Sequence, residues 1–347
     1  MEVSKPVPRA NPVPPLLLAI LLAGVYLATL APGLTWAHDG ADGGDLITAA
    51  ATGGVAHPTG YPLYLLIARI FQSLPSGNLA WRTNLMSAVF AVVAALLIYA
   101  VVRREVDRAG LVSSWMPALV AGCAAGLMPL LWSQAVITEV HALQGCLVGL
   151  VFYLSAGSWS GGLRKLMDCL RGLVLGLGMG NHVTLLLLVP VVILVTAFGA
   201  DAPEEKGRLH WGAIFRQVIF FLLGCGIYLL VPLWAAAHSP VNWGGAVTPE
   251  RLWWLVTGNL YQDQLLSVSF PEAWSRLGAS AGLLLQQFGP LGLMLGAAGL
   301  FFFLRKTPLR AITIWTFAAF LIFGIGFESF DSYLYLLPAF LAFAVWI

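Results

Sequence analysis

Long apolar runs separated by short polar stretches make up most of this chain. A membrane-spanning helix needs about 20 mainly apolar residues to cross ~30 Å of hydrocarbon, and ten of the runs reach or approach that length. The expected spans are residues 14–33, 82–102, 112–131, 135–157, 166–180, 183–198, 214–236, 278–304, 309–327 and 333–347. The pattern predicts an all-α polytopic membrane protein of about ten transmembrane helices, forming one domain over residues 1–347.

The fifth and sixth runs are short, so residues 166–198 are open to a second interpretation as one long helix. The distribution of Lys and Arg decides between the two. With two spans, 14 of the 18 basic residues fall on one side of the membrane, and only Arg69, Arg82, Arg251 and Arg276 fall on the other. Merging the runs would move six basic residues across. Because cytoplasmic loops are enriched in Lys and Arg, we expect ten spans with a cytoplasmic N-terminus.

Two of the segments between spans are long, and both are expected on the outer side: residues 34–81 and 237–277. Within the first, residues 61–71 have a helical apolar pattern that is too short for a span. This pattern predicts a helix lying in the membrane interface, with the Arg69 side chain reaching toward the headgroups. The chain stops inside an apolar run, which indicates a product truncated at its C-terminus.

Composition agrees with this interpretation and excludes several classes of protein. Apolar residues make up 59% of the chain and charged residues 10%, whereas soluble domains have roughly 45–50% and about 25%. The net charge is only +2, with no basic tract, which argues against a nucleic-acid partner. The four cysteines occur singly, so neither a disulfide framework nor a zinc site is indicated. The lipid bilayer is the expected solvent.

The acidic and imidazole side chains gather on the expected outer side. Five of the six histidines and nine of the sixteen carboxylates fall there: His38, His57, His141, His182, His238, Asp39, Asp42, Asp45, Glu139, Glu250, Asp263, Glu272, Glu328 and Asp331. Ionisable groups near lipid are costly and are usually functional. We therefore expect the chemistry of this protein on its outer face.

Three of these carboxylates, Asp39, Asp42 and Asp45, lie within seven residues of one another, with glycines between them. Glycine lets the backbone turn tightly, so the carboxylates can converge. They could deprotonate an acceptor hydroxyl or bind a divalent cation, Mg²⁺ or Mn²⁺. The plainer alternatives are a solvated turn or an Asp45 side chain that caps the following helix. No cofactor is required by the sequence.

Other outer segments carry candidate binding residues, each with a structural alternative. His57 and Tyr61 lie in a Pro- and Gly-rich turn that also suits the entry to a helix. Glu139 and His141 lie near the outer end of the fourth span, where Glu139 needs a partner such as Arg82 or an outer histidine.

The remaining candidates lie later in the chain. Asn181 and His182 form the tip between two short spans, where helix ends favour phosphate but a simple turn is equally expected. Asn242 and Trp243 offer an aromatic platform for a sugar ring or for the headgroups, and Asp331 precedes the last run. The sequence motifs of P-loop ATPases, serine hydrolases and zinc proteases are absent.

These residues also carry a family resemblance. The chain resembles the GT-C-type membrane glycosyltransferases, specifically a bacterial domain-of-unknown-function family related to transmembrane protein O-mannosyltransferases. The matching strings are Asp42-Gly-Gly-Asp45, Ala49-Ala-Ala, His57-Pro-Thr-Gly-Tyr-Pro-Leu-Tyr64, T-E-V-x-A-L from Thr138, G-N-H from Gly180, N-W-G from Asn242 and D-x-x-x-Y-x-L-P from Asp331. Asp45 stands where the family usually has Glu, and His141 where it has Tyr.

The resemblance implies a GT-C-like fold and transfer of a mannose-like hexose from a polyprenyl-phosphate donor to an acceptor hydroxyl, with inversion, at the outer face of the bacterial inner membrane. The acceptor would be a protein, lipid or glycan. Asp42 would be the general base, and Asp45 would orient the acceptor or cap the helix. Substrate binding would fall to a larger set of residues: Asp39, His57, Tyr61, Arg82, Glu139, His141, Asn181, His182, Asn242, Trp243 and Asp331, with Arg82 or Arg251 on the phosphate.

The competing interpretation is a transporter or lipid flippase that uses the same outer carboxylates to bind substrate or protons. It predicts charged groups near the middle of the membrane and repeat symmetry between halves of the chain. The sequence shows neither feature.

Overall fold

The computed structural model describes residues 11–110, 114–156, 159, 161–198, 209–302 and 308–347. Within these ranges the chain is helical, with two isolated β-bridges and no strand. The expected all-α class is confirmed. The α-helices are α1 Val13–Thr29, α2 Gly43–Thr52, α3 Pro62–Gln72, α4 Leu79–Arg108, α5 Trp115–Leu127, α6 Pro129–Ala135, α7 His141–Ser155, α8 Gly161–Met179, α9 Val189–Ala197, α10 Trp211–Cys225, α11 Leu230–Ala236, α12 Pro249–Val256, α13 Phe270–Phe302, α14 Pro308–Gly326 and α15 Leu337–Ala344.

Each of the ten expected spans coincides with a helical segment. Several are not single regular helices: α5 and α6 meet at an angle of 59°, and 3-10 turns precede α9 and α15. By length and apolar composition, four of the described helices are able to cross a membrane alone (79–108, 211–236, 270–301 and 308–326), with the α5–α6 pair as a fifth. The remaining segments are helical but shorter than a bilayer requires.

The proposed break between the fifth and sixth spans is present. Helix α8 ends at Met179, and the chain turns through Gly180–His182 before the next helical turn starts at Val183. Helix α8 then packs closely against α10. A Cβ atom on Gly176 would lie 2.0 Å from the carbonyl oxygen of Phe221, so the two backbones approach closely only because this residue is glycine.

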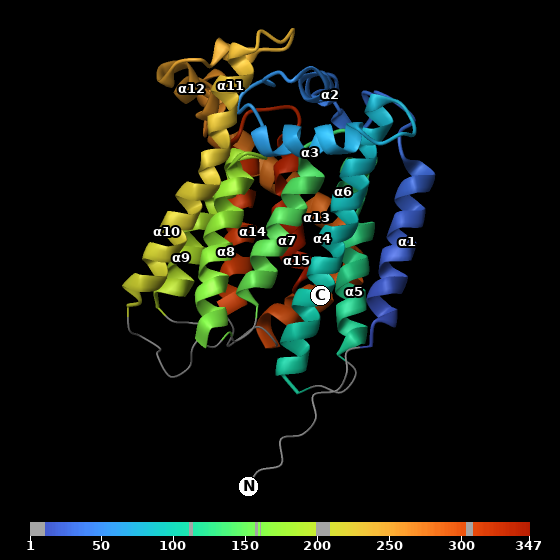
Figure 1. The fold of residues 1–347 in the computed structure, drawn as a ribbon. Coiled ribbons are helices and arrows are strands. Elements are labelled where there is room, and N and C mark those ends of the chain that lie inside the picture. The colour runs from blue at the N-terminus through green and yellow to red at the C-terminus, as the bar shows by residue number, and fades with distance from the viewer. Residues whose placement is uncertain (1–10, 111–113, 157–158, 160, 199–208, 303–307) are drawn as a thin grey trace.

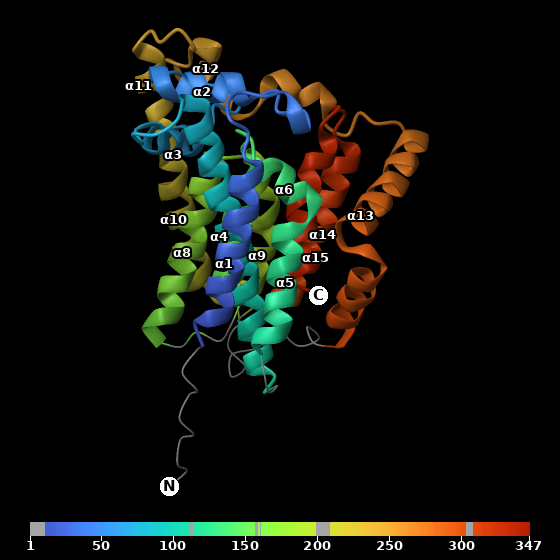
Figure 2. The ribbon, with the colours of Figure 1, turned by 90° about the vertical axis from the view of Figure 1, so that its right-hand side faces the viewer.

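The long helices run side by side as a bundle (Figures 1 and 2). Helices α2, α3, α11 and α12, which belong to or border the two long loops, lie together at one end, and α1 begins at the other end. Helix α13 leans away from the bundle and bends at Gly289, which precedes Pro290. The two long loops therefore meet on a single face of the molecule.

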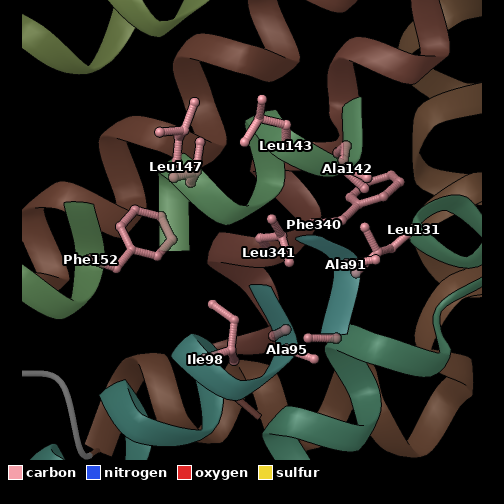
Figure 3. Close-up of a cluster of buried hydrophobic side chains, with 14 of the residues drawn as sticks. Ala91, Ala95, Ile98, Leu131, Ala142, Leu143, Leu147, Phe152, Phe340 and Leu341 are labelled. Atoms are coloured by element: carbon pink, nitrogen blue, oxygen red, sulfur yellow. The ribbon is translucent and has the colours of Figure 1, made fainter. Parts of the chain in front are cut away.

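Small side chains let the central helices approach one another. Ala91 and Ala95 of α4 face α7 and α15, where Leu143, Phe340 and other large side chains fill the space (Figure 3). Inside a bilayer such packing, rather than escape from water, holds helices together, and small residues at the contact favour it. This packed centre is the rigid base beneath the loops.

The expected interfacial helix is α3, which lies across the end of the bundle (Figure 1). The expectation for Arg69 is wrong. Its Nε donates to the Ala50 carbonyl oxygen at 3.1 Å, and its guanidinium carbon lies 4.2 Å from the centroid of the Trp234 ring. The last carbonyls of α2 lack helical partners, so Arg69 is used to join α3 to α2 rather than to reach the headgroups.

Candidate active site

The first turn of α2 places two carboxylates side by side. Asp42 is the N-cap residue, and Asp45 lies three residues later on the same face. A helix N-terminus carries partial positive charge, which favours carboxylates there. Asp42 occupies the N-cap position, although its side chain makes no capping hydrogen bond. The alternative in which Asp45 caps this helix is therefore wrong, and the Asp45 oxygens accept hydrogen bonds from His57 and Trp243 instead.

His57 lies between these two carboxylates. Its Nδ1 is 2.7 Å from Oδ2 of Asp45, and its Nε2 is 3.3 Å from Oδ2 of Asp42. The His57 backbone N–H also donates to Oδ2 of Asp45, at 2.9 Å. The His57 side chain is 8% exposed, whereas that of Asp42 is 41% exposed. The histidine is thus fixed, and Asp42 keeps an open side.

Trp243 joins the second long loop to this group. Its Nε1 donates to Oδ1 of Asp45 at 3.0 Å. The backbone supports this contact, because the Val55 N–H donates to the Val241 carbonyl at 3.0 Å and the Trp243 N–H donates to the Val55 carbonyl at 3.2 Å. A Cβ on Gly54 would lie 2.1 Å from the Val241 carbonyl oxygen, so the loops meet only across a glycine.

The three charged groups stabilise one another's ionised forms. Burial alone would lower the pKa of His57, but its hydrogen bonds to Asp42 and Asp45 and their charges raise it to about 9. Burial would raise the pKa of Asp42 and of Asp45, yet the hydrogen bonds and positive charge of His57 hold both below the usual carboxyl value. At neutral pH the group is two carboxylates around one imidazolium.

A cavity of about 430 Å³ opens beside Asp42. Its lining combines polar side chains with leucine and phenylalanine side chains. The lining residues are Ala41, Asp42, His57, Pro58, Thr59, Tyr61, His182, Val183, Thr184, Leu186, Leu187, Thr257, Gly258, Tyr261, Gln264, Leu265, Phe323, Phe327, Ser329, Phe330, Asp331 and Tyr335. Both long loops and the segments bordering α14 contribute, so the cavity joins parts of the chain nearly 300 residues apart.

Solved structures share this architecture. ArnT from Cupriavidus metallidurans, bound to undecaprenyl phosphate, matches 95% of this chain and 59% of its own with a TM-score of 0.64 at 13% identity. Archaeal oligosaccharyltransferase AglB from Archaeoglobus fulgidus matches 96% and 50%, with a TM-score of 0.52 at 12% identity. The Pmt1-Pmt2 protein O-mannosyltransferase complex of S. cerevisiae, bound to the sugar donor, matches 69% and 34%, with a TM-score of 0.51 at 16% identity.

The chain has the GT-C fold. Residues 42–205 also match the family model of the protein O-mannosyl-transferase TMEM260 N-terminal domain. The resemblance to GT-C proteins and to protein O-mannosyl-transferases found in the sequence is thereby confirmed. Under this fold the first long loop, residues 34–81, lies at one end of the helix bundle, and its Asp42 lines the cavity.

Curated relatives carry the same family name. Protein O-mannosyl-transferase TMEM260 of Mus musculus is 30% identical over 233 residues, 65% of this chain and 31% of the relative. The Dictyostelium discoideum protein of that name is 26% identical over 335 residues, 90% of this chain and 39% of the relative. The GT-C chain described here thus spans about a third of the length of the curated relatives it matches.

Several residues singled out in the sequence do line the cavity. Asp42, His57, Tyr61, His182 and Asp331 all face it. The Tyr61 ring centroid is 4.9 Å from that of His57. Nδ1 of His182 is 2.8 Å from the Thr184 hydroxyl, which fixes the ring against the cavity wall.

Other expected binding residues have supporting contacts instead. Oε1 of the buried Glu139 accepts the Asp42 backbone N–H at 3.2 Å. Asn181 donates to the Val140 carbonyl, and Asn242 donates to the Ala235 carbonyl. His141 is buried, with its ring centroid 6.2 Å from that of His182. None of these four borders the cavity.

Arg82, Arg251 and Asp39 lie outside the cavity lining. Arg82 does not pair with Glu139, because its guanidinium donates to the backbone carbonyls of Gln72, Ser76 and Gly77 and so closes that turn. Arg251 donates to the Gly245 carbonyl, and neither arginine lines the cavity. The Asp39 carboxylate is hydrogen-bonded by the Tyr333 hydroxyl, away from the cavity lining.

The structure adds cavity residues that sequence reasoning missed. Thr59, Tyr261, Gln264 and Tyr335 contribute polar atoms to the lining. Tyr335 lies within the final family-like string, which was a usable signal. Tyr261 and Gln264 lie in an irregular part of the second loop with no periodicity, so only the folded chain brings them to Asp42.

The three aspartates do not fit the expected Mg²⁺ or Mn²⁺ site. In the described part of the chain, no group of three or more His, Cys, Asp or Glu side chains is arranged to hold a metal ion. The reason is local: the His57 ring fills the space between Asp42 and Asp45, and Asp39 turns toward Tyr333.

Proposed function

We propose that this GT-C protein transfers a single sugar, a hexose such as mannose, from a polyprenyl-phosphate donor to an acceptor hydroxyl, with inversion at the anomeric carbon. Asp42 is the general base. The observation that carries the proposal is the open side of Asp42: it lines the cavity and is the most exposed of the three charged groups, whereas both Asp45 oxygens are already hydrogen-bonded.

The mixed lining of the cavity suits such a donor. A polyprenyl phosphate has an apolar tail and an anionic head, and the lining includes Leu186, Leu187 and Phe323 as well as His57. Two of the structures with the same fold are described with undecaprenyl phosphate and with a sugar donor. In this proposal the sugar lies beside Asp42, and the lipid tail contacts the apolar side chains.

The proposed reaction needs one proton acceptor and one leaving group. Asp42 accepts the proton of the acceptor hydroxyl while that oxygen forms a bond to the anomeric carbon. The bond from this carbon to the phosphate oxygen breaks, and the phosphate leaves with the electron pair. A positioned carboxylate of this kind contributes roughly 10²–10⁴-fold to such a step.

The acceptor is a hydroxyl of a protein, lipid or glycan that reaches the cavity from the loop side. The proposed location is the bacterial inner membrane, with the N-terminus in the cytoplasm and the cavity on the outer face. The long loops cluster at the end opposite the start of α1, and the expected excess of Lys and Arg on the side where α1 begins supports this orientation.

The test uses purified protein in lipid nanodiscs with a radiolabelled polyprenyl-phosphate mannose and a peptide acceptor. Asp42→Asn should reduce transfer by about 100-fold or more, since it removes the base. Asp263→Asn is the matched control, because that exposed carboxylate in the second loop lies outside the cavity lining. Full transfer by Asp42→Asn would exclude Asp42 as the base.

A further inference from the structure

The space between Asp42 and Asp45 holds a side chain. Two carboxylates this close would ordinarily repel one another or share a bound cation. Here the buried His57 ring lies between them, with a nitrogen within 3.3 Å of each. A histidine side chain of the protein therefore occupies the place between the two carboxylates where a bound cation would otherwise lie.

The two carboxylates differ in how many hydrogen bonds they accept. Asp45 accepts three hydrogen bonds, from the ring and backbone nitrogens of His57 and from the indole of Trp243. Asp42 faces one side-chain partner, Nε2 of His57, and opens into the cavity. Asp45 does not line the cavity. The hydrogen bonds of Asp45 hold the His57 ring in place, so that its Nε2 faces Asp42.

We propose that His57, held in place by Asp45 and Trp243, is a fixed cation that takes the position a divalent metal ion would have beside Asp42. Asp45 is accordingly a positioning residue and not a second base. The proposal rests on the proposed function, and it adds that transfer by this site is independent of Mg²⁺ and Mn²⁺.

The geometry also defines the route of the proton. A carboxylate oxygen lies 2.7 Å from Nδ1 and 3.3 Å from Nε2 of His57, and the imidazolium form has no ring nitrogen that can accept a further proton. The acceptor proton therefore goes to Asp42 alone. The imidazolium keeps its charge through the step, on the wall of the same cavity in which the phosphate leaves.

The charge state of His57 depends on every ionisable neighbour that faces it. Asp42 and Asp45 lie against the ring nitrogens, and Tyr61 lies 4.9 Å from the ring. Glu139 and His182 are within electrostatic range from the other side. The two carboxylates in direct contact dominate, which makes Asp45 the residue to change.

The experiment combines an NMR pH titration of His57, which needs no substrate, with the transfer assay. Histidine Cε1 signals of ¹³C-labelled protein in nanodiscs are followed by NMR against pH, and His57 is assigned by its loss in His57→Gln. We expect His57 to titrate near 9. Asp45→Asn should lower that midpoint by about 1–3 pH units. The loss of transfer rate at alkaline pH should shift to lower pH by a similar amount. Asp45→Glu, which keeps the charge, should restore most of both.

Two further measurements separate positioning from folding. Transfer should persist in EDTA and should not increase when Mg²⁺ or Mn²⁺ is added. Trp243→Phe should reduce transfer several-fold by removing one donor to Asp45, whereas Trp253→Phe, a highly exposed tryptophan in the same loop, should leave it unchanged.

The outcomes are distinguishable. Titration of His57 near 6.5 in the unmodified protein, or transfer that EDTA abolishes and Mn²⁺ restores, would overturn the fixed-cation proposal. If the NMR titrations behave as expected but no sugar is transferred, the fixed cation stands and the proposed function fails.

Discussion

The carboxylates of Asp42 and Asp45 are chemically identical and lie one helical turn apart, so their surroundings decide what each can do. Asp45 is 21% exposed with both oxygens bonded, and Asp42 is 41% exposed with an open side toward the cavity. Charged hydrogen bonds of this kind are strong and directional. A base needs a free oxygen, and only Asp42 offers one.

The Asp42–His57–Asp45 group should make stability depend on pH. His57 has its folded pKa raised from 6.5 to about 9, so its contribution is complete below pH 6.5 and is lost as pH rises through 9. This shift corresponds to about 3 kcal/mol, shared with its two partners. The carboxyl pKa values are lowered, so their contribution is complete above about 3.8 and falls in acid.

Thermal unfolding in nanodiscs, followed by intrinsic fluorescence, checks this expectation. The melting temperature should be highest between about pH 4 and 6.5 and should fall from pH 6.5 to 9. His57→Gln should flatten that alkaline decline. An equal decline in His57→Gln would mean that other groups cause it.

Individual contacts were the part of the site that the sequence predicted least well. The residue types were informative in part: of the carboxylates and histidines expected on one face, Asp42, His57, His182 and Asp331 line the cavity. The partners of Arg69 and Arg82 could not be predicted from the sequence. Each guanidinium donates to backbone carbonyls whose positions depend on how α2, α3 and the following turn fold. No periodicity in the sequence encodes those positions.

At the scale of elements, the two long loops act as one unit because their backbones meet at Gly54. The apolar runs predicted every helical segment of the bundle, because length and hydropathy are local properties. The contact between residues 54–55 and 241–243 joins two irregular segments and has no such local signal. It nevertheless sets the position of the Trp243 indole against Asp45.

Gly54→Ala should therefore impair the site from a distance. A Cβ atom would lie 2.1 Å from the Val241 carbonyl oxygen, so the loops must separate, and such overpacking costs about 1–3 kcal/mol. We expect at least a tenfold loss of transfer and a lower melting temperature. Gly44→Ala is the control, because its nearest neighbour, a Leu34 methyl, would lie at an ordinary 3.8 Å. Equal effects of the two substitutions would contradict this account.

At the scale of the whole molecule, the two ends of the helix bundle are expected to face opposite sides of the membrane. Both long loops lie at one end of the bundle, and α1 begins at the other (Figure 1). In the proposed orientation, the side where α1 begins, which has the expected excess of Lys and Arg, is the cytoplasm.

Cysteine labelling tests this topology in a background where the four native cysteines are replaced. Ser76→Cys and Asp263→Cys, each exposed in one long loop, should react with a membrane-impermeant maleimide in intact spheroplasts. Ala109→Cys, exposed just after α4, should react only after permeabilisation. Labelling of positions 76 and 263 from opposite sides would refute the topology.

The cavity is assembled from segments made at very different times during synthesis. Asp42, His57 and His182 fall within the matched family region of residues 42–205, but Trp243, Tyr261, Asp331 and Tyr335 fall after it. A nascent chain made only as far as α11 already carries its proposed base, yet lacks half of the residues that line the cavity. The lining is complete only when the segment following α14 has been made, so a partly synthesised chain has its carboxylates without the full pocket for a donor.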